Sequence, residues 1–129
     1  MADEKYPHGT FCWNELMSRD VPAAEKFYTE VLGWKAADSG MPGMKYTIFN
    51  AGEKGVGGLM EMPPDVPKEV PSHWMAYISV DDVDAAAAKV SRLGGVVMHG
   101  PEDIPKVGRF CIIQDPAGAV VSLITMKEE

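Results

Sequence analysis

The chain has 129 residues, of which 46% are hydrophobic and 24% charged, which is the usage of a globular domain that buries its own core. Its formal net charge is −7, and its 12 basic residues are scattered, which argues against a nucleic-acid partner because phosphate binding needs clustered Lys and Arg. No apolar run approaches the roughly 18 residues that a membrane span needs, and the polar start has no signal-peptide pattern. We therefore expect a cytoplasmic protein that binds neither nucleic acid nor membrane.

The first half of the chain predicts a strand, a helix and three further strands. Apolar and aromatic residues over 10–17 predict the strand, and Asp20 is typical of the N-cap of a helix over 21–32 that ends at Gly33. The apolar residues of this helix recur at three- and four-residue spacing, which predicts one buried stripe. The stripe comprises Ala24, Phe27, Tyr28, Val31 and Leu32. The three strands are expected at about 34–38, 45–50 and 55–62, with glycine-bearing turns between them.

A proline-rich segment then separates the first half from a second half of the same order. Prolines at 63, 64, 67 and 71 exclude a helix or a central strand, so we expect a linker over 63–72. The second half predicts a strand over 74–80, a helix over 83–93 capped by Asp82, and strands at about 95–99, 108–114 and 119–125. The sequence therefore predicts one βαβββ module over 9–62 and another over 73–126.

Short motifs in this order resemble those of the vicinal oxygen chelate superfamily, which includes glyoxalases, bleomycin-resistance proteins and extradiol dioxygenases. The first half carries Arg-Asp-Val-x-Ala-Ala-x-x-Phe-Tyr-x-x-Val-Leu-Gly-Trp from Arg19 to Trp34. The second half carries Val-Asp-Asp-Val-Asp at 80–84 and Asp-Pro-Ala-Gly at 115–118. The resemblance implies an α+β fold in which the curved mixed sheets of two tandem βαβββ modules form an open cleft. It also implies a homodimer that binds a small-molecule ligand.

The resemblance further implies where a metal would be bound. In metal-dependent members, a His on the first strand of each module and a Glu or similar residue on its last strand hold a divalent cation. In this chain the four positions carry Trp13, Gly58, Met75 and Ser122. None of these suits a hard dication, so we expect no metal and no other cofactor. An atypical metal site formed by Glu61 and His73 stays open as an alternative.

Four further residues of reactive types have no expected function. Cys12 and Cys111 lie in apolar runs without metal-binding or redox spacing, and we interpret both as reduced core residues. His8 precedes the first strand, where we expect it in solvent. His99 lies beside a Gly-Pro pair, where we expect a surface turn.

Strand alternation predicts which side chains share the face of the metal-ligand positions and line the cleft. The expected ligand-binding residues are Phe11, Trp13, Glu15, Gly58, Met60, His73, Met75, Tyr77 and Ser122. This aromatic and thioether lining with few polar groups suits a small, mostly apolar ligand. The alternative is that these side chains simply fill the cleft.

Glu15 and Tyr77 are the candidate catalytic residues. A carboxylate on a half-enclosed aromatic face is suited to meet a cationic group or to transfer a proton. The alternatives for Glu15 are a strand-end carboxylate in water or one paired with Arg19 or Arg109.

Three functions remain open from the sequence. The first is metal-free binding of a small, mostly apolar molecule, as in antibiotic-resistance proteins, with the acidic charge favouring uncharged or cationic ligands. The second is a lyase or isomerase of glyoxalase type, working through an atypical metal site or through acid/base catalysis by Glu15 and Tyr77. The third is an interaction or assembly module.

Overall fold

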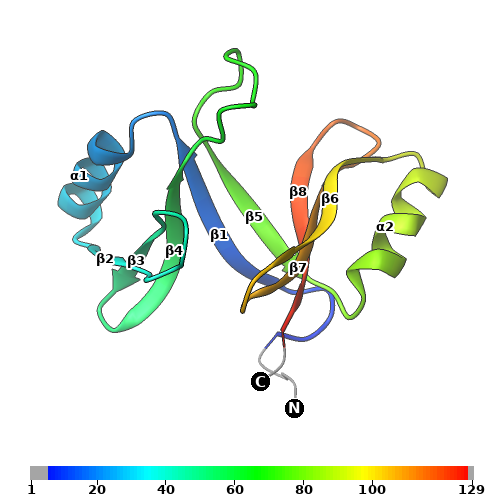
Figure 1. Cartoon of the computed structure of the whole chain (residues 1–129), viewed down its shortest axis with the longest axis horizontal. Helices are drawn as coiled ribbons and strands as arrows, with labels where there is room; N and C mark the ends of the chain where they lie inside the picture. Colours follow the sequence, from blue (N-terminus) through cyan, green and yellow to red (C-terminus); the bar gives the residue numbers. More distant parts are fainter. Residues whose placement is uncertain (1–5, 128–129) are drawn as a thin grey trace. The chain divides into compact units, whose positions relative to one another are not determined.

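The computed structural model describes residues 6–127 as two helices and eight strands in the expected order (Figure 1). The chain divides into two compact units, with boundaries inside strands β1 (Phe11–Ser18) and β5 (His73–Ser79). We call Trp13–Met75 the central unit, and we call the described residues up to Cys12 together with those from Ala76 onward the terminal unit. Each unit packs one helix on strands, so the predicted α+β class is confirmed. The module bounds, the 63–72 linker and the open cleft stay predictions.

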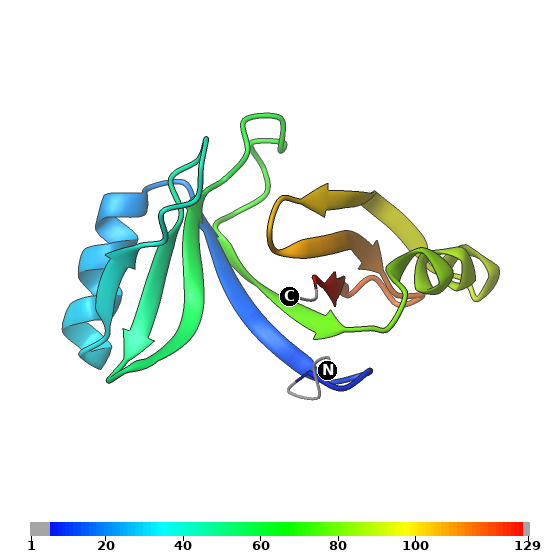
Figure 2. The same ribbon diagram turned by 60° about the horizontal axis from the view of Figure 1, so that its bottom comes forward.

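The central unit contains α1 (Val21–Leu32), β2 (Lys35–Asp38), β3 (Thr47–Ala51) and β4 (Lys54–Glu61), with strand order β2-β3-β4-β1. β1 and β4 are parallel, and the other neighbours are antiparallel. The Asp20 side chain caps α1 by accepting a hydrogen bond from the Ala23 N–H at 3.1 Å, and Gly33 ends the helix with φ 73°. Figure 2 shows α1 along one side of these strands. The core between them is built on Leu16, Phe49 and Leu59.

The predicted buried stripe of α1 is only partly correct. Ala24 and Tyr28 pack against the core, whereas Phe27, Val31 and Leu32 are 57%, 60% and 52% exposed. Val21 packs against the core together with Ala24 and Tyr28, so α1 contacts the sheet through only one side of its apolar stripe. The residues on the other side of the stripe stay outside the core, although they recur at the same helical spacing.

The terminal unit contains α2 (Val83–Arg92), β6 (Val96–Ile104), β7 (Gly108–Gln114) and β8 (Val120–Met126), with strand order β5-β8-β7-β6. Asp82 caps α2 by accepting hydrogen bonds from the N–H groups of Asp84 and Ala85. Beneath the helix lies a core of Val80, Val83, Ala87, Cys111 and Leu123. Cys111 is fully buried there, which confirms its expected core role.

Strand β6 is longer than the sequence predicts. It continues past Pro101 to Ile104, whereas the Gly-Pro pair indicated a turn after His99. β6 is the last strand of its unit, where a proline without an N–H removes no ladder hydrogen bond. The pairing of β6 with β7 shifts register on both sides of His99, and these shifts accommodate the Gly-Pro pair within the strand.

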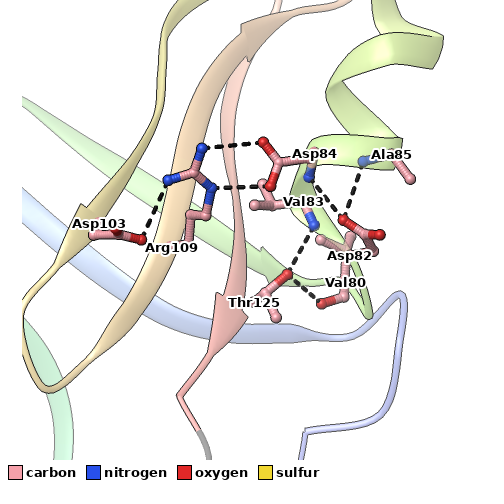
Figure 3. A network of polar contacts seen from close by, with 8 residues as sticks. All are labelled: Val80, Asp82, Val83, Asp84, Ala85, Asp103, Arg109 and Thr125. Carbon is pink, nitrogen blue, oxygen red and sulfur yellow. Dashed lines mark hydrogen bonds and ion pairs between the residues drawn. The ribbon is translucent and has the colours of Figure 1, made fainter.

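A polar network ties the first turn of α2 to the sheet beneath it (Figure 3). The Arg109 guanidinium donates to both carboxylate oxygens of Asp84, at 2.9 and 3.1 Å, and to Asp103 at 3.2 Å. The Thr125 hydroxyl accepts from the Val83 N–H at 2.9 Å and donates to the Val80 carbonyl at 3.0 Å. These contacts stabilise the helix start, where backbone N–H groups lack helical partners.

We expect this network to make stability depend on pH through Asp84. The hydrogen bonds from Arg109 lower the pKa of the Asp84 carboxyl in the folded protein. A lowered folded-state pKa stabilises the fold above about pH 4, the unfolded value, and this contribution is lost as the pH falls through the folded value. Asp84→Asn should therefore be less stable than the wild type at pH 7, and the difference should shrink with acidification in urea unfolding. An exposed substitution in the linker, Asp65→Asn, is the control. A pH-independent difference for Asp84→Asn would contradict the assignment.

Candidate functional site

A chain of hydrogen bonds crosses the face of the central sheet that points away from α1. The Trp13 Nε1–H donates to the Tyr46 hydroxyl at 2.9 Å, and the Tyr46 hydroxyl donates to Glu15 Oε1 at 2.8 Å. An indole N–H can only donate, so the hydroxyl hydrogen is directed to the carboxylate. Glu15 is only 8% exposed. We call Trp13, Glu15, Tyr46 and Gly58 the Glu15 site.

Gly58 belongs to this site because Tyr46 fills the space that its side chain would occupy. Glu15 and Gly58 are direct partners in the parallel pairing of β1 and β4. A Cβ added to Gly58 would overlap the hydroxyl oxygen and ring carbons of Tyr46. At the position where the resemblance implies a carboxylate ligand, this chain therefore has the phenol of Tyr46, the residue just before β3.

The electrostatics of the site keep this phenol protonated. Burial raises the pKa of Tyr46 far above its ordinary value, and the negative charge of Glu15 raises it further. The hydrogen bond from Trp13 acts in the opposite direction and is outweighed. Tyr46 is therefore a permanent hydrogen-bond donor to Glu15 near neutral pH, and it is unsuited to act as a base.

The alternative of a solvent-exposed Glu15 at a strand end is wrong, because the side chain is buried within β1. The two arginines proposed as its partners make other contacts. Arg19 donates to the carbonyls of Val70 and Pro67, and Arg109 is bound by Asp84 and Asp103.

The terminal unit repeats the strand register of the Glu15 site with different side chains. Tyr77 pairs with Ser122, and Ser122 pairs with Ile112, just as Glu15 pairs with Gly58 and Gly58 with Ile48. Phe110 precedes Ile112 by two residues, as Tyr46 precedes Ile48. The two registers agree with the expected matching of Gly58 to Ser122.

Ser122 differs from its counterpart Gly58 in carrying a buried polar group. It has no exposed surface, and its hydroxyl oxygen has no hydrogen-bond partner among residues 6–127. Tyr77, its neighbour on β5, is 7% exposed, with its ring centroid 6.3 Å from that of Phe110.

The remaining expected ligand-binding residues have varied environments. Met75 is 5% exposed, whereas Met60 and His73 are half-buried and Phe11 is 69% exposed. The ring Nδ1 of His73 lies 2.8 Å from the Pro71 carbonyl. An open pocket of about 490 Å³ is lined by Arg19, Met60, Glu61, Met62, Pro63 and Pro64. The expectation that all nine expected residues line one cleft stays a prediction.

The residues at the four expected ligand positions do not fit a divalent cation. Trp13 offers only an N–H donor, and the space at Gly58 is filled by Tyr46. The Met75 thioether is a soft ligand, and the Ser122 hydroxyl is neutral. Within the described residues no three His, Cys, Asp or Glu side chains are grouped so that they would hold a metal, Glu61 and His73 included.

The comparisons with known proteins agree with this fold. The model of the Glyoxalase/Bleomycin resistance protein/Dioxygenase superfamily matches residues 10–123. The chain belongs to this superfamily. A glyoxylase-like domain-containing protein of the fungus Didymella fabae is 30% identical to this chain over 92% of the chain and 94% of the fungal protein.

No helix in the described part of the chain is long and apolar enough to cross a membrane.

Two bacterial superfamily relatives are longer. CFP32 of Mycobacterium tuberculosis, whose name marks its glyoxylase assignment as provisional, is 44% identical over 90% of this chain and 44% of its own length. The anthracycline biosynthesis protein DnrV of Streptomyces peucetius is 34% identical over 93% of this chain and 42% of its own length. This chain thus spans less than half of each.

Solved structures with the same fold are distant in sequence. A hypothetical protein of Bacillus halodurans, BH1468, superposes with a TM-score of 0.66 at 15% identity, over 95% of this chain and 98% of its own. A methylmalonyl-CoA epimerase of Streptomyces coelicolor gives 0.61 at 17% identity, over 95% and 100%. Both confirm the glyoxalase-like fold.

Proposed function

We propose that this protein binds a small, mostly apolar molecule without the help of a metal, and that Glu15 receives a cationic or hydrogen-bond-donating group of that molecule. The observation that carries the proposal is the position of Tyr46, whose ring fills the space at Gly58 and whose hydroxyl holds the Glu15 carboxylate. A buried carboxylate held in one orientation is a pre-organised acceptor. A cytoplasmic location and a homodimer are further parts of the proposal.

The surroundings of Glu15 favour an aromatic ligand. The half-buried indole of Trp13 offers flat apolar surface next to the Glu15 carboxylate, and the net charge of −7 disfavours anions. The relationship to a protein named for anthracycline biosynthesis agrees with this class, since anthracyclines are planar polycyclic aromatic molecules. We therefore propose an aromatic ligand that carries an amine.

We expect 1-naphthylmethylamine, a cation at neutral pH, to bind at the Glu15 site with an affinity that depends on the carboxylate. Ile48 lies beside Gly58 on the neighbouring strand, and its methyl resonances should shift saturably during the titration. Glu15→Gln should weaken binding of the amine about tenfold, because the charge-assisted hydrogen bond is lost. The same substitution should leave the affinity for neutral 1-methylnaphthalene nearly unchanged. Equal losses for both compounds would contradict a charge-recognition role.

The metal-free part of the proposal has its own test. Protein purified without an affinity tag should contain no stoichiometric metal by elemental analysis, and calorimetric titration with Zn²⁺ or Ni²⁺ should show no site of defined stoichiometry. Stoichiometric metal bound through nitrogen and oxygen ligands would overturn it.

A second candidate function is metal-free acid/base catalysis in a lyase or isomerase of glyoxalase type. The observation that favours it is the buried Glu15 carboxylate, which the Tyr46 hydroxyl holds in place as a candidate base. Turnover of the hemithioacetal of methylglyoxal and glutathione that Glu15→Gln abolishes would support this function. A wild-type protein that leaves the hemithioacetal unchanged would leave binding as the proposal.

A further inference from the structure

A second open pocket lies at one end of the terminal sheet, around the β6–β7 turn and the residues that end and follow β8. Its volume of about 400 Å³ is within the range of small-molecule sites. None of the nine expected ligand-binding residues lines it. We call it the Lys106 pocket, and the residues that matter for its chemistry are Ile104, Lys106, Arg109, Thr125, Met126 and Lys127.

Three cationic side chains meet in this pocket, although the basic residues are scattered along the sequence. Arg109 is fixed by Asp84 and Asp103 (Figure 3), and these contacts use three of the five N–H groups of its guanidinium. Two N–H groups therefore remain for another acceptor. Lys106 and Lys127 are exposed, and neither side chain forms an ion pair within residues 6–127. The carboxylate in the lining, Asp103, is already bound by Arg109.

The backbone holds the two lysines close to each other. The Lys127 N–H donates to the Val107 carbonyl at 2.8 Å, so Lys127 lies beside the turn that carries Lys106. The backbones of β7 and β8 approach closely here, because a Cβ added to Gly108 would lie only 2.3 Å from the Thr125 carbonyl oxygen. The cationic groups are therefore presented by a fixed frame of strands, which favours the binding of one defined group.

Lys106 has an unfavourable backbone conformation. Among the described residues other than glycine, only Lys106 has a positive φ, which is 69°. The Val107 N–H donates to the Ile104 carbonyl at 3.0 Å, so Pro105 and Lys106 are the central residues of a turn. Glycine or asparagine is usual where such a turn requires a positive φ. A lysine kept in this conformation indicates that its side chain has a function.

We propose that the Lys106 pocket binds a phosphate monoester that carries an apolar group. Arginine and lysine bind phosphate oxygens, and three cations suit a group with about two negative charges near neutral pH. The apolar group lies against Ile104 and Met126, which are half-buried in the lining. The net charge of −7 repels anions at long range, but salt screens this repulsion more than it screens direct contacts.

The test is a titration of the full chain with phenyl phosphate, followed by NMR of isoleucine methyl groups. Resonances of Ile104, in the pocket lining, should shift saturably, whereas those of Ile48, beside the Glu15 site, should not. With 1-naphthylmethylamine the two reporters should exchange roles, so the two proposals fail separately. Phenol and inorganic phosphate should each bind more weakly than phenyl phosphate, because each lacks one of the recognised groups. An unchanged Ile104 resonance, or equal affinity for either fragment, would overturn the proposal.

Substitution of Lys106 by glycine separates binding from stability. Lys106→Gly relieves the positive φ, so the urea midpoint should rise, while the affinity for phenyl phosphate should fall about threefold with the loss of an exposed cation. Lys127→Gln should weaken binding by a similar factor without raising the midpoint. Lys89→Gln, at an exposed lysine in the last turn of α2, is the matched control and should keep the full affinity. Full affinity in Lys106→Gly, or an equal loss in Lys89→Gln, would contradict recognition in this pocket.

Discussion

Substitution of Gly58 by alanine is expected to lower the free energy of unfolding by about 2 kcal/mol, in the range for overpacking of a filled core position. The added methyl would overlap the Tyr46 hydroxyl and ring, and Tyr46 is itself buried and held by two hydrogen bonds. Urea unfolding of Gly58→Ala measures the loss. Gly55→Ala on the same strand is the matched control, because its Cβ would meet neighbouring side chains only at ordinary contact distances of 3.4 Å or more.

The double variant Gly58→Ala/Tyr46→Ala decides whether overlap with Tyr46 is the cause. Tyr46→Ala alone should be destabilising, because it empties a buried site. In the double variant the methyl at 58 has room, so the total loss should be smaller than the sum of the single losses. Strict additivity would show that Gly58 is required for another reason.

The second large effect is expected from Tyr46→Phe, which removes one oxygen from the Glu15 site. The change leaves the Trp13 N–H without this acceptor and Glu15 Oε1 without this donor. Each buried polar group that loses a partner costs about 1 to 3 kcal/mol, so we expect a loss of about 2 kcal/mol or more in urea unfolding at pH 7.

The control for this variant is Tyr28→Phe. The Tyr28 hydroxyl also accepts a hydrogen bond from an indole N–H, that of Trp74 at 3.2 Å, but this bond is exposed. Its loss should cost at most about 0.5 kcal/mol, since water replaces the partner. Similar losses in Tyr46→Phe and Tyr28→Phe would show that the buried chain contributes no more than a surface contact.

The sequence predicted the elements well where local chemistry determines them. Asp20 and Gly33 bound α1 because a carboxylate caps the free N–H groups and glycine adopts the left-handed conformation. The sequence failed where tertiary packing decides. Phe27 and Val31 have the spacing of a buried stripe, but α1 rests on the Ala24 edge, and no local signal distinguishes the two edges.

The candidate site could be predicted only in part for the same reason. Glu15 and Gly58 follow from strand alternation and family spacing, which fix their faces. Tyr46 was missed because its contact with Gly58 depends on the register of β3 against β4, which lies outside local sequence. The available signal was Gly58 itself, because a glycine at an expected ligand position leaves room that a large neighbouring side chain can fill. The position of His99 within β6 was missed because Pro101 indicated a turn, although an edge strand tolerates proline.

The packing of Tyr46 on Gly58 also constrains how this lineage can change by mutation. A carboxylate introduced at position 58 would collide with the phenol, so a single substitution there lowers stability before any metal ligand is gained. Losing the phenol first removes the hydroxyl that holds Glu15. Either order of mutation therefore passes through a weakened intermediate, and a metal-binding descendant would need both changes together or prior stabilisation elsewhere.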